Sequence, residues 1–192
     1  MGKSTVAAFL QKADFPVVDT DTIARELTVA GGAALPEIVR VFGREVLAND
    51  GGLNRPVMAD QVFHDAKKRL QLESILHPMI RFAWQEQVRP FRGVEEKRIL
   101  VVIPLLFETA CEGEFDRVVC VACRPEEQQE RLRVRGWSDS QANARIKAQW
   151  PIERKICSSD MVIWTSCRLE WTYRQLAEEF GLELQAAHGW DA

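Results

Sequence analysis

The first residues of the chain have the types and the order of a phosphate-binding loop. Met1-Gly2-Lys3-Ser4-Thr5 matches the second half of the pattern G-x-x-x-x-G-K-[ST]. In such a loop, glycine lets backbone N–H groups approach a triphosphate, lysine reaches its β- and γ-phosphates, and the hydroxyl binds Mg²⁺. We therefore expect Gly2, Lys3, Ser4 and Thr5 to bind a nucleotide, with Ser4 as the Mg²⁺ ligand. The alternative is an ordinary helix start that is capped by Ser4 or Thr5.

Two carboxylates and an arginine follow the next predicted strand. Asp19 and Asp21 come at the carboxyl end of the extended segment 15–18, and Arg25 follows one helical turn later. Ligands of open α/β sheets bind at the carboxyl ends of strands. An aspartate there could accept the proton of an attacking hydroxyl, and Arg25 could hold a phosphate or pair with Asp21. The alternative is that one aspartate caps the helix predicted to begin at Thr22.

Apolar periodicity predicts the elements that position these residues. Strands are predicted at 15–18, 99–103, 117–122 and 161–164, and helices at 4–11, 22–30, 36–42, 55–64, 65–76, 78–88, 126–135, 138–149, 151–158 and 169–180. The run 99–103 is continuously apolar, as expected for a strand buried on both faces of a parallel sheet. The alternation favours a three-layer α/β/α domain over residues 1–192, with an inserted helical lobe at about 33–90.

Composition limits the classes of partner. The net charge of −3 provides no general basic surface for nucleic acid, so local arginines must hold any anionic ligand. The sequence has no signal peptide and no apolar run of membrane-spanning length, which favours the cytoplasm and excludes a membrane partner. The chain has five cysteines, and Cys120 and Cys123 fall on opposite faces of a predicted strand. We therefore expect buried thiols instead of a zinc or redox site.

The order of the motifs resembles the dephospho-coenzyme A kinase family over nearly the whole chain. The matching segments are V-D-x-D-x-x-A-R at 18–25, F-G at 42–43, D-G-x-L-x-R at 50–55, V-F at 62–63, L-H-P-x-I-R at 76–81, P-L-L-F-E at 104–108, and R-I-x-x-Q followed by S-D-x-V-I within 145–163. The resemblance implies ATP-dependent phosphorylation of the ribose 3′-hydroxyl of dephospho-CoA. It also implies a P-loop kinase fold similar to the adenylate kinases, with a helical CoA-binding lobe and a lid at about 126–158.

The resemblance further implies roles for individual residues. Asp21 would be the base or orienting carboxylate, Lys3 would act in catalysis, and Mg²⁺ would be the cofactor. The residues that would bind the acceptor are Asp19, Asp21, Arg25, His77, Arg81 and Arg145. The residues that would bind ATP are Gly2, Lys3, Ser4, Thr5, Arg131 and Arg135. Arg135 would also be catalytic. The alternative for the lid arginines is a solvated helix face paired with Glu126, Glu127 and Glu130. His77 could equally cap a helix, and Glu108 could reach Mg²⁺ through water or begin a helix.

Three departures from the family pattern keep other interpretations open. Val102 stands where many members have an aspartate, and Thr165 stands where an asparagine is common. The pattern would also need a central first strand and the first half of the loop before Met1, so we expect that strand to be missing. Two alternatives stay open. The chain could be a truncated, inactive remnant that at most binds CoA-like ligands, or it could be a P-loop kinase for another small acceptor. The expected partners are ATP and dephospho-CoA, and the expected state is a monomer or weak homo-oligomer.

Overall fold

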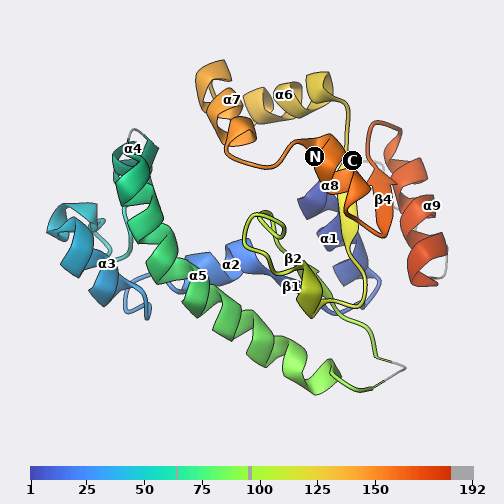
Figure 1. The fold of residues 1–192 in the computed structure, drawn as a ribbon, viewed down its shortest axis with the longest axis horizontal. Coiled ribbons are helices and arrows are strands. Elements are labelled where there is room, and N and C mark those ends of the chain that lie inside the picture. The colour runs from blue at the N-terminus through green and yellow to red at the C-terminus, as the bar shows by residue number, and fades with distance from the viewer. Residues whose placement is uncertain (64, 95–96, 183–192) are drawn as a thin grey trace. The chain divides into compact units, whose positions relative to one another are not determined.

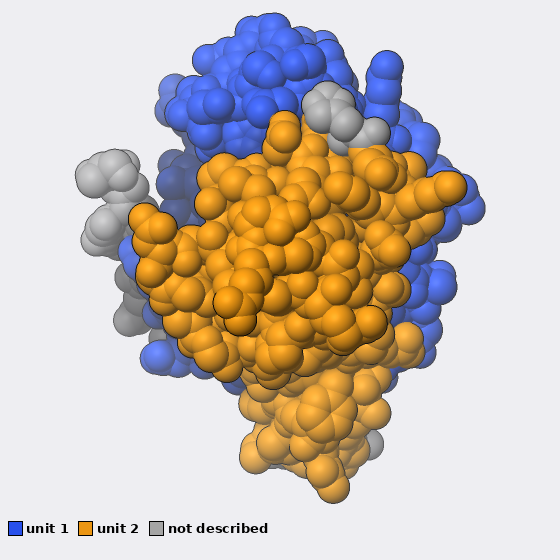
Figure 2. Space-filling model, turned by 90° about the vertical axis from the view of Figure 1, so that its left-hand side faces the viewer, with its two compact units in different colours: residues 1–17, 104–192 blue, residues 18–103 orange. Residues whose placement is uncertain are grey.

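Helices and short strands alternate along the chain in the computed structural model, which describes residues 1–63, 65–94 and 97–182 (Figure 1). Contacts between residues divide the chain into two compact units (Figure 2). Unit 1 comprises residues 1–17 and 104–192, and unit 2 comprises residues 18–103.

Unit 1 is built around one pair of parallel strands. Its elements are α1 (Lys3–Lys12), η3 (Glu112–Glu114), β3 (Val119–Ala122), α6 (Pro125–Val134), α7 (Asp139–Lys147), α8 (Ile152–Cys157), β4 (Met161–Trp164) and α9 (Leu169–Phe180). Val119 pairs with Met161 and Ala122 with Trp164, so the two strands end at the same level. This common edge brings the residues that follow β3 and β4 next to each other.

The core of unit 1 forms where α1 packs against α9. Val6, Phe9 and Leu10 are buried on α1, and Tyr173 and Leu176 are buried on α9. Both sets follow the spacing of three and four residues that places side chains on one helix face. The rings of Phe9 and Tyr173 stack with centroids 4.5 Å apart. This packing fixes the orientation of α1 and therefore of the predicted nucleotide-binding residues at its start.

Unit 2 is mostly helical. Its elements are β1 (Val17–Asp19, of which Val17 falls in unit 1), α2 (Thr20–Glu26), α3 (Leu35–Phe42), η1 (Arg44–Val46), α4 (Arg55–Phe63), α5 (Ala66–Val88), η2 (Arg89–Phe91) and β2 (Leu100–Val102). The core consists of Ala34, Ile38, Phe42, Val46 and Met58. Helices α2, α3 and α4 each pack against α5, which is therefore the scaffold of this unit.

The prediction of two helices at 65–76 and 78–88 is wrong. They form one helix, α5, with Pro78 in its interior. A proline inside a helix removes one backbone hydrogen bond and costs about 3 kcal/mol. Leu72 and Leu76 before the proline and Met79 after it all pack against the unit 2 core. Burial of side chains on both sides of Pro78 outweighs the cost and holds the helix together.

The strands form two small sheets, where we expected one parallel sheet without its central first strand. The described residues form two two-stranded sheets, one of β1 with β2 and one of β3 with β4. Strand β2 is only partly buried, so the expectation that 99–103 is covered on both faces is wrong. In a two-stranded sheet, each strand has one edge whose backbone N–H and C=O groups are not paired within the sheet.

The remaining helices and strands lie close to their predicted positions. The capping box at the start of α7 is confirmed, because the Gln141 N–H donates to Ser138 Oγ and the Ser138 N–H donates to Gln141 Oε1. His64, the last residue of one predicted helix, lies outside the described residues. Among the helices that the structure describes, none is long and apolar enough to cross a membrane.

Candidate functional site

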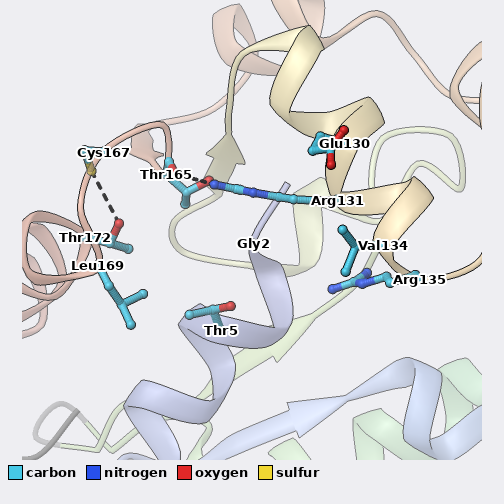
Figure 3. A pocket seen from close by; sticks show the side chains of 10 residues that line it. All are labelled: Gly2, Thr5, Glu130, Arg131, Val134, Arg135, Thr165, Cys167, Leu169 and Thr172. Atoms are coloured by element: carbon cyan, nitrogen blue, oxygen red, sulfur yellow. Dashed lines mark hydrogen bonds between the residues drawn. The ribbon is translucent and has the colours of Figure 1, made fainter. Parts of the chain in front are cut away.

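A cavity of about 410 Å³ lies at the amino end of α1 in unit 1 (Figure 3). This volume is in the range of sites for small ligands. The cavity is lined by Gly2, Thr5, Glu130, Arg131, Val134, Arg135, Thr165, Cys167, Leu169 and Thr172. The structure thus brings together four of the predicted nucleotide-binding residues, namely Gly2, Thr5, Arg131 and Arg135.

Gly2 sets the direction in which α1 begins. It is the residue before the helix and has φ +80° and ψ +6°, a left-handed conformation that glycine adopts readily. A Cβ atom at this position would lie 3.0 Å from Thr165 Cγ2, so a larger residue would also be in tight contact with Thr165. Ser4 and Thr5 lie within the first helical turn, and neither caps the helix. The alternative that one of them is merely a cap is wrong.

The first turn of α1 has the properties of an anion site. The first N–H groups of a helix have no partner within the helix, and the helix dipole makes this end positive. Lys3 is the first helical residue, and the side chains of Ser4 and Thr5 are exposed. Because these groups follow a left-handed glycine, the turn can place N–H groups and hydroxyls around a phosphate.

Arg131 reaches from α6 across the cavity to the end of β4 (Figure 3). Its Nη1 donates to Thr165 Oγ1 at 2.9 Å, and its Nη2 donates to the Thr165 carbonyl at 2.7 Å. It also pairs with Glu127 at 3.1 Å. Arg131 is therefore paired with an acidic residue of its own helix, as the alternative predicted, and it also lines the cavity.

Arg135 and Arg145 lie in different surroundings. Arg135 is the C-cap residue directly after α6 and is exposed in the wall of the cavity. Arg145 lies on α7, and its guanidinium stacks over the Trp137 ring at 4.7 Å from the centroid. Arg145 thus belongs to unit 1, whereas the other predicted acceptor residues belong to unit 2.

In unit 2, Asp19 caps the helix that carries Asp21. The Asp21 N–H donates to Asp19 Oδ1 at 2.8 Å, so α2 begins at Thr20 and not at Thr22. The capping alternative is confirmed for Asp19. Asp21 and Arg25 are both exposed on α2, and no ion pair joins these two described residues. Both charged groups can therefore meet a ligand.

His77 and Arg81 lie four residues apart on α5, the helix against which α2 packs. His77 is in the middle of this helix, so the alternative that it caps a helix start is wrong. It is half-buried, and Arg81 is exposed. Unit 2 thus presents Asp21 and Arg25 on one helix and His77 and Arg81 on another that packs against it.

Glu108 has a role that the sequence did not indicate. Its Oε1 accepts from Lys155 Nζ at 2.8 Å and from the Trp150 N–H at 2.7 Å, and both charged side chains are largely buried. Burial raises the pKa of the Glu108 carboxyl, but these hydrogen bonds outweigh it and hold the pKa below its ordinary value. Glu108 lies in a turn, so the alternative that it begins a helix is wrong. The alternative that it reaches Mg²⁺ through water stays a prediction.

Five cavity residues were not predicted from the sequence: Glu130, Val134, Cys167, Leu169 and Thr172. The one sequence signal near these residues was Thr165, which stands where the family pattern commonly has an asparagine. The expectation of buried thiols holds for Cys111, Cys120 and Cys123, but Cys157 and Cys167 are exposed.

Known proteins resemble the chain in sequence and in structure. A family model described as dephospho-CoA kinase matches residues 1–170. The dephospho-CoA kinase of Bacillus anthracis is 41% identical over 91% of this chain and 88% of its own length. That of Bdellovibrio bacteriovorus is 41% identical over 84% of this chain and 81% of its own length.

Two solved structures have a similar fold. The crystal structure of TT1252 from Thermus thermophilus has a TM-score of 0.77 and 32% identity, and it covers 94% of this chain and 91% of its own. The dephospho-CoA kinase from Campylobacter jejuni has a TM-score of 0.68 and 25% identity, with 94% and 90% covered.

Proposed function

The chain belongs to the dephospho-CoA kinase family, and on this premise we propose how its residues bind ATP and the acceptor. It is an ATP-dependent phosphotransferase of the α/β P-loop kinase fold. Its reaction is the phosphorylation of dephospho-CoA by ATP, the last step of coenzyme A synthesis. The observation that carries the assignment of ATP to unit 1 is the cavity that joins Gly2 and Thr5 to Arg131 and Arg135.

ATP binds with its phosphates at the amino end of α1. Backbone N–H groups after Gly2 surround the phosphates, and the Lys3 ammonium contacts the β- and γ-phosphates. The Ser4 hydroxyl is exposed in the first turn, where it can serve as a single protein ligand for Mg²⁺. One hydroxyl fits this ion, because Mg²⁺ usually takes most of its ligands from water and substrate phosphates. When bound, Mg²⁺ neutralises charge on the phosphates.

The lid arginines stabilise charge on the transferred group. We assign Arg131 and Arg135 to the phosphates of ATP, because both line the cavity and come from one helix. An arginine in this role is worth about 10³ to 10⁵ in rate in related phosphoryl transfers. We propose that residues 126–158 form the lid and that Arg145, which lies in this segment, binds the acceptor.

Unit 2 supplies the acceptor side. We assign Asp21 as the base or orienting carboxylate for the 3′-hydroxyl, because it is exposed and has no ion-pair partner among the described residues. Asp19 acts by fixing the start of α2, since its carboxylate caps that helix. Arg25, His77 and Arg81 bind charged and polar groups of dephospho-CoA, and residues 33–90 form the acceptor lobe.

We also infer the setting in which the enzyme acts. The negative net charge and the small-molecule substrates support a cytoplasmic enzyme without a nucleic-acid or membrane partner. A monomer or weak homo-oligomer is sufficient for the proposed mechanism, because every assigned residue comes from one chain.

Asp21→Asn tests the catalytic assignment. We expect turnover to fall by about 10² to 10⁴, the usual contribution of a general base, while ATP binding stays unchanged. The measurement is ADP release with ATP, Mg²⁺ and dephospho-CoA, together with titration of ATP. The matched control is Asp60→Asn, the same change at an exposed site on α4. Wild-type turnover in Asp21→Asn would remove Asp21 from the mechanism.

A further inference from the structure

Thr165 joins three segments of unit 1 through one buried side chain. It follows β4 and is 6% exposed. Its Oγ1 accepts from Arg131 and lies 3.1 Å from the Ala122 carbonyl and 3.3 Å from the Met1 carbonyl. A hydroxyl has one proton and two lone pairs, so it can accept from Arg131 while donating to one of the two carbonyls. The hydroxyl thus connects the end of β3, the start of α1 and an arginine of α6.

The methyl group of Thr165 contacts the other side of the site. Its Cγ2 would be 3.0 Å from a Cβ atom at Gly2, so it lies directly against the Gly2 backbone. The main-chain N–H of Thr165 donates to the Ala122 carbonyl at 2.8 Å, which fixes the residue at the end of the strand pair. Backbone, hydroxyl and methyl therefore hold Thr165 in one position beside the residues that begin α1.

Arg131 takes its direction from this residue. Two of its nitrogens bind Thr165, and Nη2 also binds Glu127. Among the described residues, these bonds use three of the five N–H groups of the guanidinium. The side chain is 37% exposed, so the remaining N–H groups can reach a ligand in the cavity.

We propose that Thr165 is a positioning residue whose hydroxyl holds the Arg131 guanidinium toward the ATP phosphates. This inference rests on the proposed role of Arg131 in binding ATP. Loss of the hydroxyl leaves Arg131 bound to the Thr165 carbonyl and to Glu127, so the arginine stays nearby. It loses the bond from Nη1 that fixes the plane of its guanidinium.

The test compares Thr165→Val, which keeps the shape and loses the hydroxyl, with Thr165→Ser, which keeps the hydroxyl. We expect Thr165→Val to lower kcat/KM for ATP by about 10-fold, as for loss of a hydrogen bond to a charged group. KM for dephospho-CoA should not change, and Thr165→Ser should stay close to wild type. Should Thr165→Val fail to fold, Thr165→Ala compared with Thr165→Ser isolates the same hydroxyl.

A double-mutant cycle with Arg131→Ala separates this inference from the proposed function. In the Arg131→Ala background, Thr165→Val should have no further effect on kcat/KM, because the residue acts through the arginine. Additive effects, or equal losses in Thr165→Ser and Thr165→Val, would overturn the positioning role. If Arg131→Ala itself has wild-type kcat/KM for ATP, the assignment of Arg131 fails instead.

Discussion

At the scale of single residues, Gly2 combines a backbone requirement with a steric one. We expect Gly2→Ala to lose about 1 to 2 kcal/mol of stability from its left-handed conformation. ATP binding should weaken further, because the added Cβ would press on Thr165 Cγ2 from 3.0 Å and turn the N–H groups that we propose to face the phosphates. Urea unfolding and titration of ATP measure the two effects.

Gly31→Ala is the matched control for Gly2→Ala. Gly31 has φ +76°, and nothing would lie within 4 Å of an added Cβ. The Gly31→Ala variant should lose about as much stability as Gly2→Ala, and its affinity for ATP should equal that of wild type. Equal ATP affinity in the two variants would show that the contact between Gly2 and Thr165 does not shape the site.

Local spacing is enough to propose candidate residues that belong to one short pattern. Gly2, Lys3 and Ser4 lie in such a contiguous stretch of sequence. The bonds of Thr165 join residues 34, 43 and 164 positions apart. Only the folded strand pair and the packing of α1 bring these residues together, so local spacing could not predict them.

At the scale of elements, the pair of Glu108 and Lys155 connects the segment after β2 to α8. The side chains are 15% and 9% exposed, so each charge depends on its hydrogen-bond partners within the protein, the other member of the pair included. We expect Glu108→Gln to lose about 3 to 5 kcal/mol near neutral pH, the usual effect of breaking a buried pair. An amide can still accept the Trp150 N–H, so the change isolates the charge.

The loss in Glu108→Gln should depend on pH. The pKa of Glu108 is lowered from 4.5, so its pairing stabilises the fold fully above that value. As the pH falls below 4.5 and through the lowered pKa, wild type becomes protonated and loses this advantage. Urea unfolding of both proteins against pH should therefore show curves that converge in acid. Glu86→Gln, at an exposed pair with Arg89, should match wild type throughout.

Elements were predicted well where local signals agreed with packing. The start of α7 followed from a capping box that acts within four residues. Pro78 is a local signal for a helix end, but the core contacts of Leu76 and Met79 keep α5 continuous, and local sequence does not contain these contacts. The start of α2 was misplaced because either Asp19 or Asp21 could have capped it, and the choice depends on backbone direction after β1.

At the scale of the whole molecule, the assigned residues divide between the two units. The ATP group of Gly2, Lys3, Ser4, Thr5, Arg131 and Arg135 lies in unit 1. The acceptor group of Asp19, Asp21, Arg25, His77 and Arg81 lies in unit 2, and Arg145 is the exception. Each unit also has its own buried core, at the contact of α1 with α9 and around Ile38. The two substrates should therefore stabilise different parts of the chain.

Hydrogen exchange with each substrate alone tests this division. A ligand at 100 times its Kd stabilises the state that binds it by about 2.7 kcal/mol, which slows exchange through opening of that unit by about 100-fold. We expect ATP with Mg²⁺ to protect α1, α6 and the end of β4, and dephospho-CoA to protect α2 and α5. Lys3→Ala should remove the protection by ATP and leave that by dephospho-CoA intact. Protection of α2 and α5 by ATP to the same degree as α1 would contradict the assignment of one substrate to each unit.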